Sequence, residues 1–413
     1  MKKLKLILVL GLMMVGLGAQ AQKQVFGIWY DLDDVNREAM VIAPPEGQPA
    51  YSGNIAIPAV IGTSFGSYDV TAIGERAFES CYELQSVIIG KEVKVIHESA
   101  FDGCGMLASV TFEEGSKLEE IGFWAFINCS SLTKIELPET LLKLRERAFN
   151  GAGLKSINIP ANVELIEPNP FAFCYQLDVI TVASGNTNYL GIDGVLFTAD
   201  AKTLITYPTG NEATEYTIPS SVEEIGKYAF ANSWYLKDVT FPSALRNIGL
   251  NAFTNSKALK DVVFNEGLEV INPDAFAYSQ SIESIALPST LTFIDNGAFE
   301  GCDGIKKITS LAVTPPALGD DAFNEVPAGT PLYVPNAAMA NYDIDPWNNF
   351  AIRDVAELEL IAGYKDNFWN LMEEMNAIGD QTSDVTIQKL MQNGLLIIRR
   401  GEKTYNILGA EVR

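Results

Sequence analysis

The sequence predicts a solenoid built mainly from β-strands, and two recurring columns of apolar residues are the evidence. A phenylalanine, usually preceded by alanine, returns about every 23 residues, and an aliphatic residue stands five positions before it, as Ile73 does before Phe78. The repeat phenylalanines are Phe78, Phe101, Phe126, Phe149, Phe171, Phe230, Phe253, Phe276, Phe299 and Phe323. A fixed period of this length is typical of solenoids, in which one unit cannot bury its apolar face without its neighbours.

A strand-like stretch follows each repeat phenylalanine. Leu84–Ile89 reads L-x-x-L-x-L, and Leu107–Phe112 and Leu132–Leu137 repeat the pattern. The apolar residues alternate as a strand with one buried face requires. This strand, within a repeat of about 20–29 residues, is the signature of leucine-rich repeats. We therefore expect about ten coils of about 23 residues, whose repeat phenylalanines stack in one continuous core.

The complete unit resembles the BspA-like leucine-rich repeats of secreted bacterial surface proteins. The shared pattern is L-x-x-I-x-I-P-x-x-V-x-x-I-G-x-x-A-F-x-x-C-x-x-L, and it extends over roughly residues 60–350. The stretches that carry it run from Ser156–Pro160 through Ala229-Phe230 and from Pro288 through Cys302. The resemblance implies a curved leucine-rich-repeat solenoid, β-rich with short helical turns. It also implies, for many members, adhesion to host or bacterial macromolecules, but no single ligand.

The N-terminus has the features of a signal peptide over residues 1–21. Three lysines among the first five residues precede an apolar run, Leu6–Leu17, and Ala19-Gln20-Ala21 forms a cleavage site with small residues. The apolar run is too short for a membrane span. We expect export, with the mature chain extracellular, at the cell surface or in the periplasm, and no insertion into a membrane.

One step of the repeat is longer than the others. Phe171 and Phe230 are 59 residues apart, which leaves about 13 residues beyond two regular units. Gly194–Phe197 and Thr203–Pro208 flank a polar stretch and predict a β-hairpin insertion within about residues 183–215. An insertion of this kind can be a binding element or a structural part of the coil.

The two ends depart from the repeat. Residues 22–60 predict an N-terminal cap over a solenoid that spans residues 61–354, since the apolar ends of a solenoid need covering. Tyr342, Trp347 and Phe350 are expected to close the other end. Residues 355–413 form a separate C-terminal segment, in which Phe368–Ile378 predicts a short helix. The stretch 395–408 of that segment predicts a hairpin.

The charge limits the class of partner. Removal of the three lysines in residues 1–21 changes the formal net charge from −23 to −26. Such an acidic surface repels nucleic-acid phosphates and anionic lipids, which excludes nucleic acid as a partner. Basic proteins, cations and neutral glycans remain compatible partners, and the alternative is that the charge serves solubility and self-repulsion alone.

The residues that usually carry chemistry argue against an enzyme. The five cysteines each lie three residues after a repeat phenylalanine, a column that holds small residues in other coils, so buried free thiols are expected rather than disulfides or a nucleophile. His97 is the only histidine, and its column suits a surface turn. A zinc site with paired histidines is therefore excluded. We expect no catalytic residues, no metal and no cofactor.

Three aromatic residues are the candidate binding residues. Trp124 and Tyr228 lie two residues before a repeat phenylalanine, in a column that is otherwise mostly polar, and Trp234 lies four residues after one. Exposed aromatic side chains are enriched at binding hot spots, although these three could equally pack on neighbouring coils. The outward columns of the strands hold small and polar residues, so the strand face alone is expected to bind weakly.

These observations predict an exported, non-enzymatic protein that adheres to or recognises a host or bacterial macromolecule, protein or glycan. The alternative is a structural or assembly component of the cell envelope that binds a bacterial partner or glycan.

Overall fold

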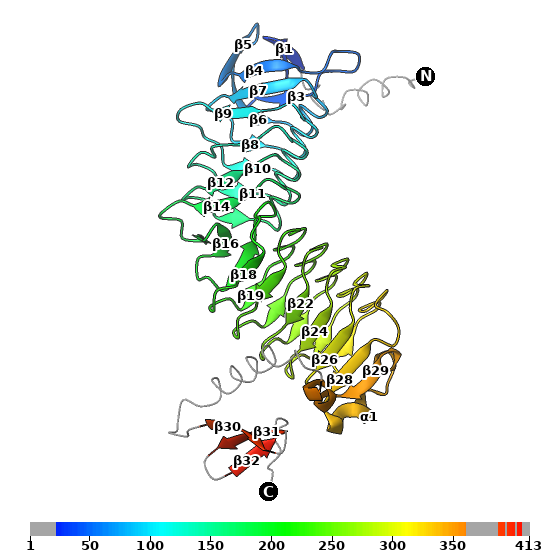
Figure 1. The fold of residues 1–413 in the computed structure, drawn as a ribbon. Coiled ribbons are helices and arrows are strands. Elements are labelled where there is room, and N and C mark those ends of the chain that lie inside the picture. The colour runs from blue at the N-terminus through cyan, green and yellow to red at the C-terminus, as the bar shows by residue number, and fades with distance from the viewer. Residues whose placement is uncertain (1–21, 361–386, 393–394, 401–402, 407–413) are drawn as a thin grey trace, which may run out of the picture. The chain divides into compact units, whose positions relative to one another are not determined.

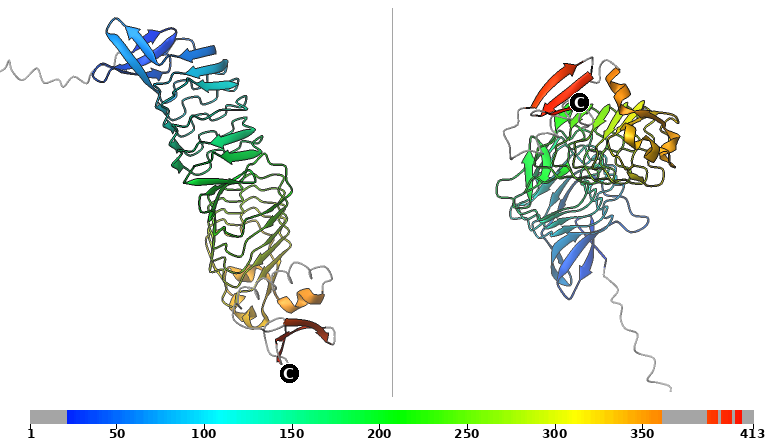
Figure 2. Two further views of the ribbon diagram at one scale, coloured as in Figure 1. Left: turned by 90° about the vertical axis from the view of Figure 1, so that its left-hand side faces the viewer. Right: turned by 90° about the horizontal axis from the view of Figure 1, so that it is seen from below.

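The computed structural model describes residues 22–360, 387–392, 395–400 and 403–406. Two compact units make up the chain: unit 1 comprises Met1–Leu177 and Val182–Asn188, and unit 2 comprises Asp178–Thr181 and Tyr189–Arg413. Within each unit the chain winds in stacked coils with parallel strands (Figures 1 and 2). The expected leucine-rich-repeat solenoid is confirmed, and the expected signal peptide and the helix Phe368–Ile378 lie outside the described residues.

Unit 1 contains two sheets. Its nine-stranded sheet has the order β1-β2-β3-β6-β8-β10-β11-β13, with β5 paired to β6. These strands are β1 (Lys23–Val25), β2 (Ile28–Asp33), β3 (Glu38–Ile42), β5 (Val60–Thr63), β6 (Gly66–Ile73), β8 (Val95–Ile96), β10 (Glu120–Ile121), β11 (Lys143–Leu144) and β13 (Leu165–Ile166). The second sheet holds the repeat strands β4 (Gly53–Ile57), β7 (Leu84–Ile89) and β9 (Ser109–Phe112). Two further strands are β12 (Ser156–Ile159) and β14 (Val179–Val182), the latter at the division between the units.

A stack of phenylalanine rings fills the core of unit 1. Phe78, Phe101 and Phe126 are fully buried, with ring centroids 4.8 Å and 5.0 Å apart and nearly parallel planes. Tyr51, within the expected N-terminal cap, extends this stack, since its ring lies 4.7 Å from that of Phe78. The hydroxyl of Tyr51 donates to the carbonyl of Ile42 and accepts from the N–H of Trp29. Hydrogen bonds as well as packing therefore hold Tyr51 at the end of the stack.

Unit 2 is built in the same way. Its eight-stranded sheet has the order β15 (Tyr189–Ile192), β16 (Val195–Thr198), β17 (Thr203–Thr206), β19 (Glu224–Ile225), β21 (Asn247–Ile248), β23 (Val270–Ile271), β25 (Phe293–Ile294) and β27 (Ala317–Leu318). Strands β16 and β17 are antiparallel, which confirms the hairpin insertion, and β17 then pairs in parallel with β19. The repeat strands form a seven-stranded parallel sheet, β18 (Glu215–Thr217), β20 (Asp238–Thr240), β22 (Asp261–Val263), β24 (Ser284–Leu287), β26 (Lys307–Ser310), β28 (Pro331–Val334) and β29 (Ala351–Asp354).

A second stack of rings runs through unit 2, from Phe230 to Phe323, with successive centroids 4.6–5.2 Å apart. Trp347 lies 5.7 Å from Phe323, and its indole N–H donates to the carbonyl of Pro316 at 2.9 Å. Phe350 meets the same ring edge-on. These two residues cover the end of the stack as the sequence predicted, whereas a single core through both units stays a prediction.

Helix is confined, within the described chain, to residues 336–360. The helices are η1 (Asn336–Ala338), α1 (Met339–Tyr342), η2 (Trp347–Asn349) and η3 (Val355–Leu360). Further along the chain, β30 (Ile387–Gln392), β31 (Leu395–Arg400) and β32 (Lys403–Asn406) form an antiparallel sheet, and the pairing of β31 with β32 is the C-terminal hairpin that was expected.

The turns around the repeat phenylalanines are hydrogen-bonded turns with two left-handed residues each. Positive φ values occur two residues before the phenylalanine, at Arg76, Ser99, Trp124, Arg147, Asn169, Tyr228, Asn251, Asp274, Gly297 and Asp321. They recur two residues after it, at Ser80, Gly103, Asn128, Gly151, Phe173, Asn232, Asn255, Tyr278, Gly301 and Glu325. In the first turn the N–H groups of Arg76, Phe78 and Ser80 all donate to carbonyls of the next coil. The left-handed residues at these two positions orient every second N–H of the turn toward the next coil.

The cysteine column has the predicted role. All five cysteines are buried free thiols, and the thiol of Cys104 donates to the carbonyl of Phe78 in the preceding coil. Ser256 and Ser279 make the same bond with their hydroxyls in unit 2, which shows that the column needs a small donor. His97 is exposed in a turn, also as expected.

Candidate functional site

The strand face of unit 1 is interrupted after its third strand. Residues 132–137 carry the same apolar pattern as β7 and β9, yet they form no strand, and β9 is left at the edge of a three-stranded sheet. No backbone hydrogen bond joins β9 to residues 133–137, all of which belong to the described chain. We call residues 133–137 the open rung.

The rest of that coil remains tied to its neighbour. Ile121 pairs in register with Ile96, the rings of Phe101 and Phe126 stack, and the N–H of Phe101 donates to the carbonyl of Ala125. The separation is therefore confined to the strand face. The loop after β9 is longer than its counterpart in the preceding coil, since Phe112 and Leu118 are two residues further apart than Ile89 and Val93.

The longer loop bonds to the coil before it. The N–H of Glu113 donates to the carbonyl of Ile89 at 3.0 Å, and that of Lys117 donates to the carbonyl of Lys91 at 2.8 Å. The carboxylate of Glu113 in turn accepts from the N–H of Lys91.

A groove of about 800 Å³ lies between β9 and the open rung. Its lining runs from Ala108 to Phe112 on one side and from Lys134 to Thr140 on the other, with Glu113, Gly115 and Ser116 from the loop. Lys134 pairs with Glu136 at 2.7 Å, so the remaining carboxylates, Glu113 and Glu139, leave the lining with an excess of negative charge.

The strand face of unit 2 is continuous and differs in charge. Glu215, Asp238 and Asp261 occupy successive rungs in register, followed by Ser284 and Lys307. The hydroxyl of Ser284 donates to Asp261. Burial lowers the pKa of Lys307, and the nearby Asp261 partly offsets this effect. These strands pair with one another in sequence from β18 to β29, so between them side chains are the groups that face a partner.

Trp124 lies in unit 1, in the left-handed column. Its φ is 56°, its side chain is half-buried, and its ring centroid is 4.4 Å from that of Phe123. The indole N–H is buried and has no hydrogen-bond partner within the described chain. A non-glycine residue in this backbone region costs roughly 1–2 kcal/mol. The tryptophan is therefore held by packing at a position that favours glycine or asparagine.

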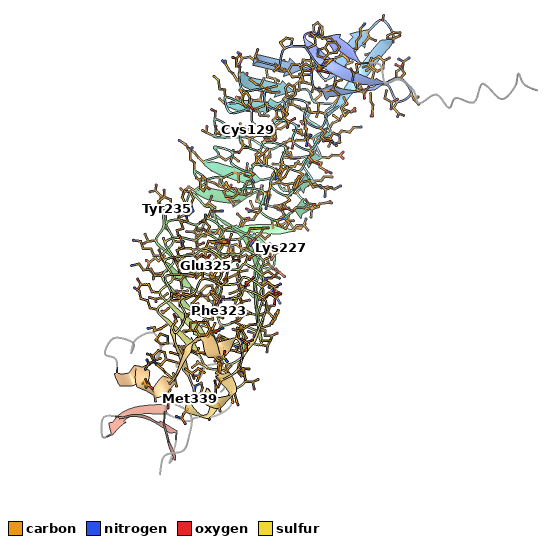
Figure 3. The ribbon with its side chains drawn as sticks, turned by 90° about the vertical axis from the view of Figure 1, so that its right-hand side faces the viewer. Cys129, Lys227, Tyr235, Phe323, Glu325 and Met339 are labelled. Carbon is orange, nitrogen blue, oxygen red and sulfur yellow. The ribbon has the colours of Figure 1, made fainter. Side chains whose placement is uncertain are left out.

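Tyr228 and Trp234 lie in unit 2, on either side of Phe230 in one turn. Tyr228 is half-buried with φ 58°, whereas Trp234 is 42% exposed and its neighbour Tyr235 is 45% exposed. The structure thus places two of the three predicted residues in one turn and the third in the other unit. Figure 3 labels Tyr235 at one edge of unit 2 and Lys227 at the other.

Sequence reasoning missed Tyr278, which is 48% exposed. Its ring covers Gly301 of the next coil so closely that a Cβ on that glycine would meet it at 2.5 Å. The hydroxyl donates to Glu300 at 3.1 Å, and this bond raises the pKa of Tyr278. Gly301 lies two residues after Phe299, the repeat phenylalanine of the next coil. This glycine is the sequence signal that could have indicated an aromatic ring packed over its position.

The described residues contain no group of three or more histidine, cysteine or acidic side chains that could hold a metal ion. Burial raises the pKa of Cys302 to about 12 and that of Cys129 well above its ordinary value, so both remain protonated at neutral pH. Within the described residues, moreover, no helix has the length and apolar character that crossing a bilayer requires.

Comparisons with known proteins agree with this geometry. The profile of the BspA type leucine rich repeat region matches residues 64–178 and 209–327, in six copies, over more than half of the chain. The pneumococcal vaccine antigen PcpA has a similar structure, with a TM-score of 0.62 and 21% identity, covering 81% of this chain and 98% of its own. A leucine-rich repeat protein from Eubacterium ventriosum gives a TM-score of 0.57 at 22% identity, covering 79% and 90%. One from Bacteroides ovatus gives 0.55 at 21% identity, covering 80% and 90%. No protein of curated function matches the sequence.

Proposed function

Because the chain belongs to the BspA-type leucine-rich-repeat family, we propose that it is an exported, non-enzymatic protein that adheres to or recognises a macromolecule through its solenoid surface. The partner is a protein or a glycan. The observation that carries this proposal is the set of large aromatic side chains in the repeat turns: Trp234, which is 42% exposed, and the half-buried Trp124 and Tyr228.

Rigid presentation favours these residues as anchors. The turn around Phe230 is bonded to the next coil through its N–H groups and packed on a buried phenylalanine stack, so an exposed ring there loses little freedom on binding. Aromatic side chains dominate interface energies when they enter a partner's pocket. Trp124, Tyr228 and Trp234 are the proposed binding residues, and export through a signal peptide of residues 1–21 belongs to the same proposal.

Alanine substitution of these three residues tests the proposal. A glycan array and pull-downs from host matrix and bacterial envelope would first supply the partner. Each substitution is then expected to weaken binding by about 1–3 kcal/mol, with thermal stability nearly unchanged. Phe65→Ala is the matched control, because Phe65 is 61% exposed but lies in the N-terminal region, away from the repeat turns.

The outcome separates binding from packing. If the melting temperature falls while affinity per folded molecule stays constant, the aromatic residues serve the fold alone. The half-buried Trp124, with its contact to Phe123, is the residue for which this contrary result is most informative. N-terminal sequencing of the exported chain checks the processing, with Gln22 as the expected first residue.

A further inference from the structure

The open rung presents a main-chain binding edge within the solenoid. We propose that the groove between β9 and the open rung binds an extended, basic segment of another polypeptide, which enters as an added strand. This deepens the proposed binding function, because it names a partner class and a place that the aromatic residues do not occupy.

The backbone on both sides of the groove is available. Strand β9 pairs with β7 on one side only, so its other edge carries unpaired N–H and C=O groups. Across the groove, no residue of 133–137 donates a backbone N–H bond within the described chain. Strand edges of this kind are the features that bind peptides by β-augmentation, where main-chain hydrogen bonds supply affinity.

The side chains that line the groove favour a basic occupant. The charged residues of the lining are Glu113, Glu136, Glu139 and one cation, Lys134, which is already paired with Glu136. Glu113 accepts a hydrogen bond from the N–H of Lys91, and Glu139 accepts one from the N–H of Ala161. Lysine or arginine at alternate positions of a bound strand would reach these carboxylates on the outer face.

The dimensions suit a short strand. The groove holds about 800 Å³, and the edge from Ser109 to Glu113 extends roughly 13 Å at the usual rise of a strand. About five residues of an extended peptide would therefore lie along it. The phenylalanine stack and the pairing of Ile96 with Ile121 connect the rest of this coil to its neighbour. The groove is therefore bounded by a part of the coil that stays packed.

The experiment uses the mature chain and three synthetic nine-residue peptides. The first alternates lysine with threonine, the second carries glutamate in place of lysine, and the third repeats the first with N-methyl groups on alternate amides. The lysine peptide is expected to bind, and the other two to bind about tenfold more weakly or worse, since each lost hydrogen bond or charge pair is worth a severalfold change. Equal binding of the N-methylated peptide would overturn the proposal.

Two protein variants locate the site. Glu136→Lys should weaken the lysine peptide about three- to tenfold, whereas Asp238→Lys, with the same change in charge on the continuous face of unit 2, should leave affinity within about twofold. An equal loss of affinity in both variants would mean that the overall charge of the protein, rather than the groove, determines peptide binding. That result would contradict the proposal. Trp234→Ala should leave peptide binding intact, so failure of the aromatic sites and failure of the groove are distinguishable.

Hydrogen exchange gives an independent measurement on the free chain. Amides of residues 133–137 should exchange rapidly and become protected when the lysine peptide binds, while those of β22 and β24 should be protected throughout. Protection of residues 133–137 before the peptide is added would show that the rung is closed in solution, and would refute the proposal.

Discussion

Two coils with nearly the same sequence pattern pair differently in the two units. In unit 1 the stretch Leu132–Leu137 forms no strand, while in unit 2 the equivalent stretch ending at Phe264 contributes β22 to a seven-stranded sheet. Both coils keep their buried phenylalanine and their two-residue strand on the opposite side. The comparison teaches that the ring stack and the short strands hold a coil, and that the repeat strand can be released without unwinding it.

The largest expected effect tests this division of roles. Phe126→Ala and Phe276→Ala each remove a fully buried ring and should cost about 3–5 kcal/mol of unfolding free energy in the unit concerned. Phe276 also contacts Phe264 edge-on, which links its ring to the strand side. We therefore expect Phe126→Ala to expose chiefly its own coil and Phe276→Ala to disturb β22 and β24 as well.

Urea denaturation measures the free energy of unfolding, and hydrogen exchange shows which coils lose protection. The unit that is not mutated provides the control within each experiment. If the two variants spread the loss of protection over equal numbers of coils, the repeat strand contributes nothing to coupling between coils, and the comparison fails.

A smaller effect is expected from two glycines that lie against the preceding coil. A Cβ on Gly153 would stand 2.1 Å from the carbonyl oxygen of Ser130, and one on Gly304 the same distance from that of Gln280. Alanine at either position must push the coils apart, at a cost of about 1–3 kcal/mol or more. Gly304→Ala should be the more destabilising, because it strains an intact sheet, whereas Gly153→Ala adjoins the coil of the open rung.

Thermal melts of the two variants give the ranking, with Gly115→Ala as the control, since nothing lies within 4 Å of its would-be Cβ. The positive φ of Gly115 adds a small backbone cost to this control. A larger loss for Gly153→Ala would show that the open rung is the stiffer of the two regions.

The sequence predicted the repeat fold, but it did not predict the open rung. The 23-residue period, the phenylalanine stack and the β16–β17 hairpin each followed from spacing or pattern, because burial on a repeating backbone imposes a repeating chemistry. The two-residue excess between Phe112 and Leu118 is visible in the sequence, yet only the structure shows that Glu113 and Lys117 bond backward. Likewise, Trp124 and Tyr228 attract attention as aromatics, while their positive φ has no sequence signal of its own beyond the asparagine and glycine in the same column.

Proline substitution compares the two strand faces directly. Glu136 and Thr309 occupy the same column, but Thr309 pairs in register with Ala286 on one side and with Tyr333 on the other, and Glu136 has no backbone partner within the described chain. Proline removes an N–H, so Thr309→Pro should cost about 1–3 kcal/mol more than Glu136→Pro. Denaturant titration gives both values, and alanine at the same two positions controls for loss of the side chain. Equal costs would mean that the amide of Glu136 is bonded in solution.

The smallest expected effect concerns a pair of side chains that is charged in unit 1 and neutral in unit 2. Arg145 donates to Glu120 and to Glu167, each at 2.8 Å. At the equivalent positions of unit 2, the amide of Asn272 donates to Asn247. The hydrogen bond from Arg145, opposed by burial and aided by the charges of Arg145 and Lys143, lowers the pKa of Glu120.

This difference predicts a pH dependence for unit 1 alone. Because the pKa of Glu120 is lower in the folded chain than in the unfolded chain, its stabilising contribution is present above the ordinary glutamate pKa of about 4.3 and is lost as the pH falls through the folded value. Arg145→Met should therefore destabilise unit 1 by up to about 1 kcal/mol at pH 6 and by much less at pH 3. Asn272→Ala should change the stability of unit 2 by the same amount at both pH values, since neither amide titrates. Urea titrations at the two pH values, with exchange used to assign each unit, provide the measurement. An Arg145→Met effect that is equal at pH 6 and pH 3 would place the role of this arginine in packing rather than in charge.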